Sequence, residues 1–256
     1  MVLAADRAPR RPVGPPRRRR SWGRRIGRAL VRAVAVVVVL GVLLVAAGWA
    51  LTPTVDDAAT RVAGQLSAHS ARELQGPVPT RVADALIATE NSRFYSTPGV
   101  DPISVLRAPF ALVLGRDQGG ATLEQQLAKN LYENGSQGLT ARLAEGVLAL
   151  KLDRAWSKQQ ILRMYLDDGY YGHGFYGLTA ATQGYFGVRP ADLSWAQASL
   201  LAGLFQAPSA YDPFVHPDVA RARQAHVLDR LVAVGTLTRA HADAIARESW
   251  GLRSAG

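Results

Sequence analysis

The segment Gly119–Asn130, with the sequence GGATLEQQLAKN, joins a glycine pair to a helix-forming run. The glycines indicate a loop that enters a helix, and the free backbone N–H groups of a helix N-terminus favour anions. Leu123 and Leu127 share one face of this helix, which we expect to be buried. Gln125 and Lys129, four residues apart, share another face. The segment therefore predicts amides and one cation that project together beside an anion-binding end.

The rest of the chain after the first fifty residues also follows a helical pattern. Ser157 and Ser194 each begin a Ser-x-x-Gln capping-box sequence before an apolar run. Long alternating strand patterns are absent, so we expect a mainly α fold. Residues 169–187 hold six glycines and several aromatic residues, which suggests a shaped loop. Residues 79–246 therefore read as one compact helical domain.

The positive charge of the chain is confined to its beginning. Residues 1–32 hold eleven arginines and one acid, whereas residues 33–256 hold nineteen basic and nineteen acidic residues. A nucleic-acid-binding domain carries its basic patch on folded surface, so we expect no nucleic acid partner. The chain has no cysteine, which excludes a disulfide scaffold and a cysteine-based zinc site.

Residues 33–51 form an uncharged apolar run of nineteen residues, enough for a helix to cross the ~30 Å core of a bilayer. Arginines precede the run, so the positive-inside rule predicts a cytoplasmic N-terminus and an extracytoplasmic main domain. A cleaved signal peptide is one alternative, although its apolar region usually spans only ~7–15 residues. A buried core helix is the other, although no polar stripe breaks the run.

These observations predict five segments. They are a disordered basic cytoplasmic tail at 1–32, a transmembrane anchor at 33–51, a stalk at 52–78, the main domain at 79–246 and a C-terminal tail at 247–256. Within the domain, Ile103–Leu114 is apolar nearly all round but too short to span a bilayer. The residues alone leave two readings open for it, a core helix or a segment that dips into the membrane.

Several ordered motifs resemble those of the peptidoglycan glycosyltransferases of glycosyltransferase family 51. The family's first motif, roughly E-D-x-x-F-x-x-H-x-G, is matched by Glu90, Phe94 and Gly99. The second, roughly G-G-S-T-I-T-Q-Q-x-x-K-N, is matched at the same spacing by the segment Gly119–Asn130. The third, roughly R-K-x-K-E, keeps its glutamate as Glu145. Further similarity covers residues 157–166, 171–187 and 200–213, so it extends over the whole domain.

The chain also departs from these motifs. Asn91 and Thr97 replace the aspartate and histidine of the first motif, and Ala121 and Glu124 replace a serine and a threonine of the second. Alanines at positions 141 and 144 leave one basic residue in the third. Asp167 stands where the family usually has asparagine. These changes reduce the polar and cationic lining that the resemblance implies.

The resemblance implies a lysozyme-like helical domain behind a single transmembrane helix, and an enzyme that polymerises lipid II. The acceptor's 4-hydroxyl would attack the donor's anomeric carbon with inversion, giving a β-1,4 glycan and releasing undecaprenyl pyrophosphate. Glu90 would be the base and Glu145 the second catalytic glutamate, which handles pyrophosphate or a metal. Substrate-binding residues would be Lys129, Arg142, Gln125, Gln126, Asn130, Thr122 and Arg93. A divalent cation, Mg²⁺, is expected, although the sequence names no metal ligands. The resemblance also favours the membrane reading of Ile103–Leu114.

Two rival functions are kept beside this one. The motif departures allow a non-catalytic protein that binds lipid II or acts as a scaffold for cell-wall synthesis. A glycan-cleaving enzyme is a third hypothesis, but a hydrolase needs no cations for pyrophosphate. Expected partners are lipid II, undecaprenyl-pyrophosphate-linked glycan, the cell membrane, and transpeptidases or other wall-synthesis proteins. The chain shows no S-x-x-K motif, so we expect a monofunctional enzyme.

Overall fold

The computed structural model describes residues 20–104, 120–133 and 138–254. These residues form helices and no named strand, with one isolated bridge between Tyr170 and Tyr176. The mainly α fold expected from the sequence is confirmed. Most of the apolar segment Ile103–Leu114, and Gly119, lie outside the described residues. The chain divides into two compact units, residues 1–47 and 48–256.

The first long helix is α1, Arg20–Leu51. Within its part from Ile26 to Leu51, the most apolar window of 18 residues has a mean hydropathy of 2.8, and none of that window is buried. By length and composition it is the one helix among the described residues that is suited to cross a membrane. The helix begins earlier than the anchor that was expected at residues 33–51. Residues 20–32, which were expected to belong to a disordered tail, are helical as well.

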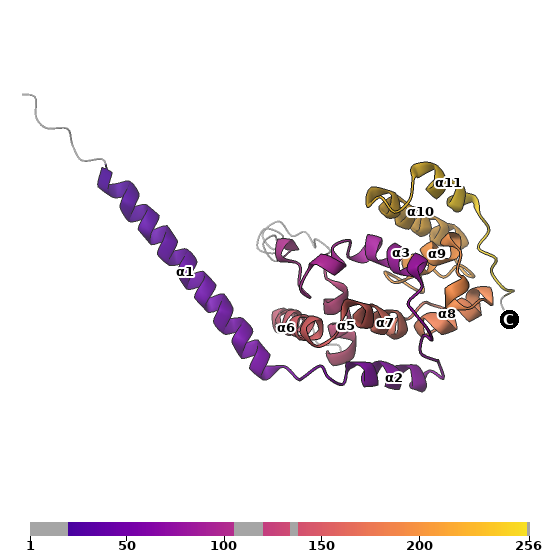
Figure 1. Ribbon diagram of the computed structural model, residues 1–256, viewed down its shortest axis with the longest axis horizontal. Coiled ribbons are helices and arrows are strands. Elements are labelled where there is room, and N and C mark those ends of the chain that lie inside the picture. The colour runs from indigo at the N-terminus through magenta and orange to yellow at the C-terminus, as the bar shows by residue number, and fades with distance from the viewer. Residues whose placement is uncertain (1–19, 105–119, 134–137, 255–256) are drawn as a thin grey trace, which may run out of the picture. The chain divides into compact units, whose positions relative to one another are not determined.

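The second unit is a bundle of short helices around a common core (Figure 1). In chain order it contains α2 Ala58–Ala68, α3 Thr80–Glu90, η1 Phe94–Ser96, α5 Leu123–Tyr132, α6 Leu139–Ala155, α7 Lys158–Asp168, α8 Gly177–Phe186, η2 Pro190–Asp192, α9 Trp195–Leu204, α10 Pro217–Ala233 and α11 Arg239–Arg247. Helices α3, α9 and α10 pack on one another, and α5 packs on α6 and α7. The predicted capping boxes at Ser157 and Ser194 are present. The loop expected over 169–187 is wrong for its second half, which forms α8.

Residues 55–66 and Trp250, which flank the domain expected at 79–246, are part of this bundle. Val55, Val62 and Leu66 are buried in the same core, so α2 packs on the domain where a stalk was expected. At the other end, Trp250 is buried, and its indole N–H donates to Gln224 Oε1 at 2.9 Å. The structure therefore differs from both expectations, because apolar side chains of these segments complete the core.

Asp167 holds the backbone of Leu74, in the segment between α2 and α3, against α7. Its carboxylate is 3% exposed and accepts the backbone N–H of Leu74 at 3.0 and 3.2 Å. Burial raises the pKa of Asp167 to about 6, although the Leu74 hydrogen bond and the charge of Arg163 act in the opposite direction. At neutral pH the domain therefore buries a carboxylate charge at a cost in stability.

We predict that Asp167→Asn stabilises the protein at pH 7.5 by about 1–3 kcal/mol. The amide oxygen keeps the Leu74 hydrogen bond, and the buried charge is removed. Because the pKa is raised in the folded state, the native carboxyl contributes stability below pH ~4 and loses it as pH rises through about 6. The gain should therefore vanish near pH 4. Denaturant unfolding across this pH range tests this, with exposed Asp243→Asn as control. A loss of stability at pH 7.5, or a gain independent of pH, contradicts it.

Candidate functional site

Glu90 is the last residue of α3 and faces two other helices. Its Oε2 lies 3.4 Å from Nε2 of Gln126 on α5, and its Oε1 lies 3.7 Å from the guanidinium of Arg223 on α10. The Glu90 side chain is 18% exposed. Both contacts are longer than a usual hydrogen bond of 2.7–3.2 Å. The carboxylate is thus oriented by its neighbours, while neither oxygen is held by a strong hydrogen bond.

The amide of Gln126 is fixed from the other side by Tyr165 of α7. The Tyr165 hydroxyl donates to Gln126 Oε1 at 2.7 Å, and its ring stacks on Phe205 with centroids 5.0 Å apart. Burial raises the pKa of Tyr165, and the negative charges of Glu90 and Asp168 raise it further. The hydroxyl therefore stays protonated and acts as a donor, which turns the amide N–H of Gln126 towards Glu90.

Asp168 lies next to this group at the end of α7. Its Oδ2 accepts a hydrogen bond from Asn130 Nδ2 at 2.6 Å, while its buried Oδ1 has no partner among the described residues. Burial raises the pKa of Asp168 to about 6, and the Asn130 hydrogen bond partly offsets this. Gln126 and Asn130, four residues apart on α5, thus contact carboxylates on two different helices. We call Glu90, Gln126, Asn130, Tyr165 and Asp168 the Glu90 cluster.

Lys129 lies on α5, which packs on α6. Lys129 is exposed, and its charge acts on the carboxylate of Glu133, as does that of Glu145. Burial, and then the nearby charge of Glu145, raise the pKa of Glu133. Arg142 is exposed on α6, and its guanidinium has no hydrogen bond or ion pair within the described ranges. The charges of Lys129 and Glu145 therefore both act on Glu133. The two cations, Lys129 and Arg142, are available to a ligand.

Three more of the predicted substrate-binding residues, besides Gln126 and Asn130, have partners within the protein. Thr122 and Gln125 form the capping box that starts α5, and the buried Thr122 hydroxyl donates to the carbonyl of Gly99. Arg93 forms an ion pair with Asp101, and hydrogen bonds from Ser104 and Arg93 hold the pKa of that carboxyl low in spite of its burial. These residues position the loops around the Glu90 cluster, and their contact with a substrate remains a prediction.

The structure explains why glycine stands at position 99, one of the matched motif positions. Its φ is +70°, and a Cβ there would lie 2.5 Å from the carbonyl oxygen of Ala149. Only glycine combines this backbone conformation with so close an approach. The loop after α3 is therefore pressed against α6.

Glu124, which departs from the family motif, lies inside the protein. Its carboxylate is fully buried, and Oε1 lies 2.5 Å from the ammonium of Lys158. The same ammonium contacts Asp153 Oδ1 at 2.6 Å, donates to the Thr97 carbonyl at 2.6 Å, and lies 4.8 Å from the centre of the Phe94 ring. Burial raises the pKa of Glu124, and Lys158 partly offsets this. Glu124 is thus a buried counter-charge rather than part of an open surface.

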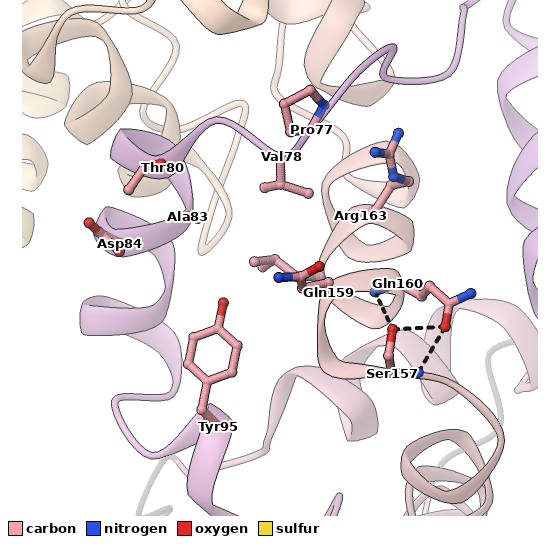
Figure 2. Close-up of a pocket in the computed structure, with 11 residues that line it drawn as sticks. Pro77, Val78, Thr80, Ala83, Asp84, Tyr95, Ser157, Gln159, Gln160 and Arg163 are labelled. Carbon is pink, nitrogen blue, oxygen red and sulfur yellow. Dashed lines mark hydrogen bonds between the residues drawn. The ribbon is translucent and has the colours of Figure 1, made fainter.

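A pocket of about 360 Å³ opens between α3, η1 and α7 (Figure 2). Asp84, Tyr95 and Gln159 are among its lining residues, beside the capping box of Ser157 and Gln160. None of the nine predicted site residues lines it. The chemistry of the Glu90 cluster, rather than this pocket, therefore defines the candidate site.

Three residues around the site were not predicted from the sequence, namely Tyr165, Asp168 and Arg223. Tyr165 and Asp168 are three residues apart on α7, a spacing that places them on one face of the helix, and this signal was present in the sequence. Arg223 had no such signal, because its contact with Glu90 joins residues far apart along the chain.

The candidate site thus joins an acid at a helix end to an amide that orients it and a tyrosine that holds the amide. The family described as Transglycosylase matches residues 60–232, and the chain belongs to that family. A putative transglycosylase of Cupriavidus necator is 36% identical over 179 residues, covering 70% of this chain and 78% of that protein.

Larger relatives share only part of their length with this chain. Penicillin-binding protein 1A of Aquifex aeolicus is 41% identical over 165 residues, which cover 63% of this chain and 22% of that protein. The chain thus spans about a fifth of the length of the penicillin-binding proteins it matches. The crystal structure of penicillin-binding protein 1A from Haemophilus influenzae matches with a sequence identity of 22% and a TM-score of 0.42. The match covers 69% of this chain and 17% of the other chain.

We predict that Lys158→Met destabilises the protein by about 3–5 kcal/mol, because it leaves buried Glu124 without its counter-charge. Glu124→Gln in the same chain should restore a large part of that loss, with a coupling of at least ~1 kcal/mol. Denaturant unfolding of the two single variants and the double variant measures the coupling. Lys129→Met, which removes an exposed lysine, is the control and should change stability by under ~0.5 kcal/mol. Additive effects of the two substitutions contradict the pairing.

Proposed function

We propose that this chain is a membrane-anchored peptidoglycan glycosyltransferase that joins lipid II units into β-1,4 glycan strands. The observation that carries the proposal is the Glu90 cluster. Its neighbours orient the Glu90 carboxylate, and neither carboxylate oxygen forms a strong hydrogen bond. Membership of the Transglycosylase family supports it. The apolar helix α1 supports a membrane location, which the substrates require because both carry lipid tails.

Glu90 would act as the general base. It would accept the proton of the acceptor's 4-hydroxyl as that oxygen attacks the donor's anomeric carbon and the pyrophosphate leaves. A positioned base contributes typically 10²–10⁴-fold to such a rate. Gln126 would hold the carboxylate in place through Nε2, and Arg223 would fix its other oxygen. Tyr165 acts through Gln126 and is a positioning residue.

The departing pyrophosphate would be stabilised by the exposed cations near Glu145. Lys129 and Arg142 project from neighbouring helices and form no ion pair within 4 Å in the described ranges. Charge-assisted hydrogen bonds to phosphate are about twice as strong as neutral ones. These cations would therefore act most strongly as charge builds on the leaving group.

A divalent cation fits the residues beside them. Within the described residues, no three His, Asp or Glu side chains are arranged to hold a metal by themselves. Mg²⁺, however, usually takes one or two carboxylates and completes its shell with substrate phosphates and water. Glu145 and Glu133 offer such a pair, and both buried oxygens of Glu133 have no hydrogen-bond partner there. Bound Mg²⁺ would neutralise charge on the pyrophosphate.

We predict that Glu90→Gln lowers kcat for glycan synthesis at least 10²-fold, because the amide cannot accept the proton. Polymerisation of labelled lipid II by the full-length protein in detergent with Mg²⁺ measures this. Glu248→Gln, an exposed glutamate at the end of α11, is the matched control and should keep full activity. Product from Glu90→Gln at the wild-type rate would remove Glu90 from the role of base. Bound lipid II with no product from the wild type favours the scaffold function instead, and reducing ends released from finished glycan favour a hydrolase.

Tyr165→Phe should lower kcat about tenfold and leave KM nearly unchanged, because the freed amide of Gln126 no longer orients Glu90. Tyr95→Phe, which changes an exposed tyrosine away from the Glu90 cluster, is the control. Steady-state kinetics with both variants separates kcat from KM. An equal loss in the two variants, or a loss only in KM, would contradict the positioning role of Tyr165.

A further inference from the structure

A second pocket, of about 330 Å³, lies beside the last turn of α1 and the end of α6. Trp49, Val55, Asp56, Lys151 and Arg154 line it. It shares no residue with the Glu90 cluster. Because Trp49 belongs to the last turn of the apolar helix, the pocket lies where that helix ends.

Lys151 places a buried positive charge in the wall of this pocket. The residue is 7% exposed, and its ammonium donates to the carbonyls of Thr52 and Pro53 at 2.8 and 2.9 Å. The ammonium also lies 5.3 Å from the centre of the Trp49 ring. No carboxylate within 4 Å balances it among the described residues. Burial lowers the pKa of Lys151, as expected for a cation without an anionic partner.

Arg154 supplies a second cation one helical turn further along α6. It is exposed, and its guanidinium forms no hydrogen bond or ion pair within the described part of the chain. Residues three apart share a helix face, so both cations serve the same pocket. Asp56, the one acid of the lining, is exposed and forms no ion pair with either of them in that part. The lining therefore keeps a net positive charge that suits an anion.

The walls of the pocket are held in place by packing and hydrogen bonds. A Cβ on Gly48 would lie 2.8 Å from Val147 Cγ2, so glycine lets the end of α1 approach α6 closely. The Trp156 indole N–H donates to the Val55 carbonyl at 3.0 Å. The segment that forms one wall is therefore fixed to α6 before any ligand binds, which reduces the entropy lost on binding.

We propose that this pocket binds the phosphate of an anionic phospholipid head group. The inference rests on the proposed anchoring of the protein by α1. A tryptophan in the last turn of a membrane-spanning helix lies at the level of the head groups. Lys151 and Arg154 contact the phosphate, and the Trp49 ring packs on the glycerol part of the lipid. A lipid bound here would hold the end of α6 at the membrane surface.

The test uses the full-length protein with ¹⁵N-labelled tryptophan in a neutral detergent at low ionic strength. The indole signal of Trp49 is assigned by its loss in Trp49→Phe. Titration with dihexanoyl phosphatidylglycerol should give a saturable shift of this signal. Dihexanoyl phosphatidylcholine, whose head group has no net charge, and inorganic phosphate should each bind at least about tenfold more weakly.

Arg154→Gln should weaken phosphatidylglycerol binding about tenfold, because one charged contact to the phosphate is lost. Arg247→Gln, which removes an exposed arginine at the end of α11, is the matched control and should bind as the wild type does. Unchanged affinity of Arg154→Gln overturns the proposal, as does equal binding of the two lipids. Inorganic phosphate bound as tightly as phosphatidylglycerol also overturns it, since the site would then serve a soluble anion.

The titration needs no polymerisation, so it separates this inference from the proposed function. A protein that makes no glycan but binds phosphatidylglycerol through Arg154 supports the lipid site alone. A protein that makes glycan but shows no saturable shift of Trp49 refutes the lipid site alone.

Discussion

The ammonium group of Lys158 joins the parts of the helical domain that carry the candidate site. It contacts Glu124 at the start of α5, Asp153 near the end of α6 and the Thr97 carbonyl in the loop after α3. Because three segments meet at one partly buried cation, their relative positions are set together. Gln126 lies two residues after Glu124 on the same short helix, so its approach to Glu90 depends on this junction.

The departures from the family motifs have different consequences in the structure. Glu124 pairs with Lys158 through Oε1, and Asp167 accepts a hydrogen bond from Leu74, so both carboxylates have a partner inside the protein, although Oε2 of Glu124 is buried without one among the described residues. Neither points a new charge into the Glu90 cluster. The residues that orient Glu90, namely Gln126, Tyr165 and Arg223, are all present. The substitutions at 124 and 167 thus change how the domain is held together more than how Glu90 is arranged.

Local sequence signals predicted the helices and failed where distant segments meet. The capping boxes at Ser157 and Ser194 and the apolar helix α1 were predictable, because each depends on neighbouring residues. Thr122 and Gln125 carry the same Ser/Thr-x-x-Gln signature, which could have shown that they start a helix. By contrast, α2 was taken for a stalk, since nothing local says which core Val62 and Leu66 join. The pairing of Glu124 with Lys158, 34 residues apart, likewise needs the tertiary structure.

In the proposed mechanism, Glu90 is the base that activates the acceptor. A structure of the full-length protein with lipid II bound in lipid nanodiscs would test it most directly. We expect one Glu90 carboxylate oxygen within ~3.2 Å of the acceptor's 4-hydroxyl, with Gln126 still beside the carboxylate. A 4-hydroxyl more than ~5 Å from Glu90, and within hydrogen-bond reach of another carboxylate such as Asp168, would contradict it.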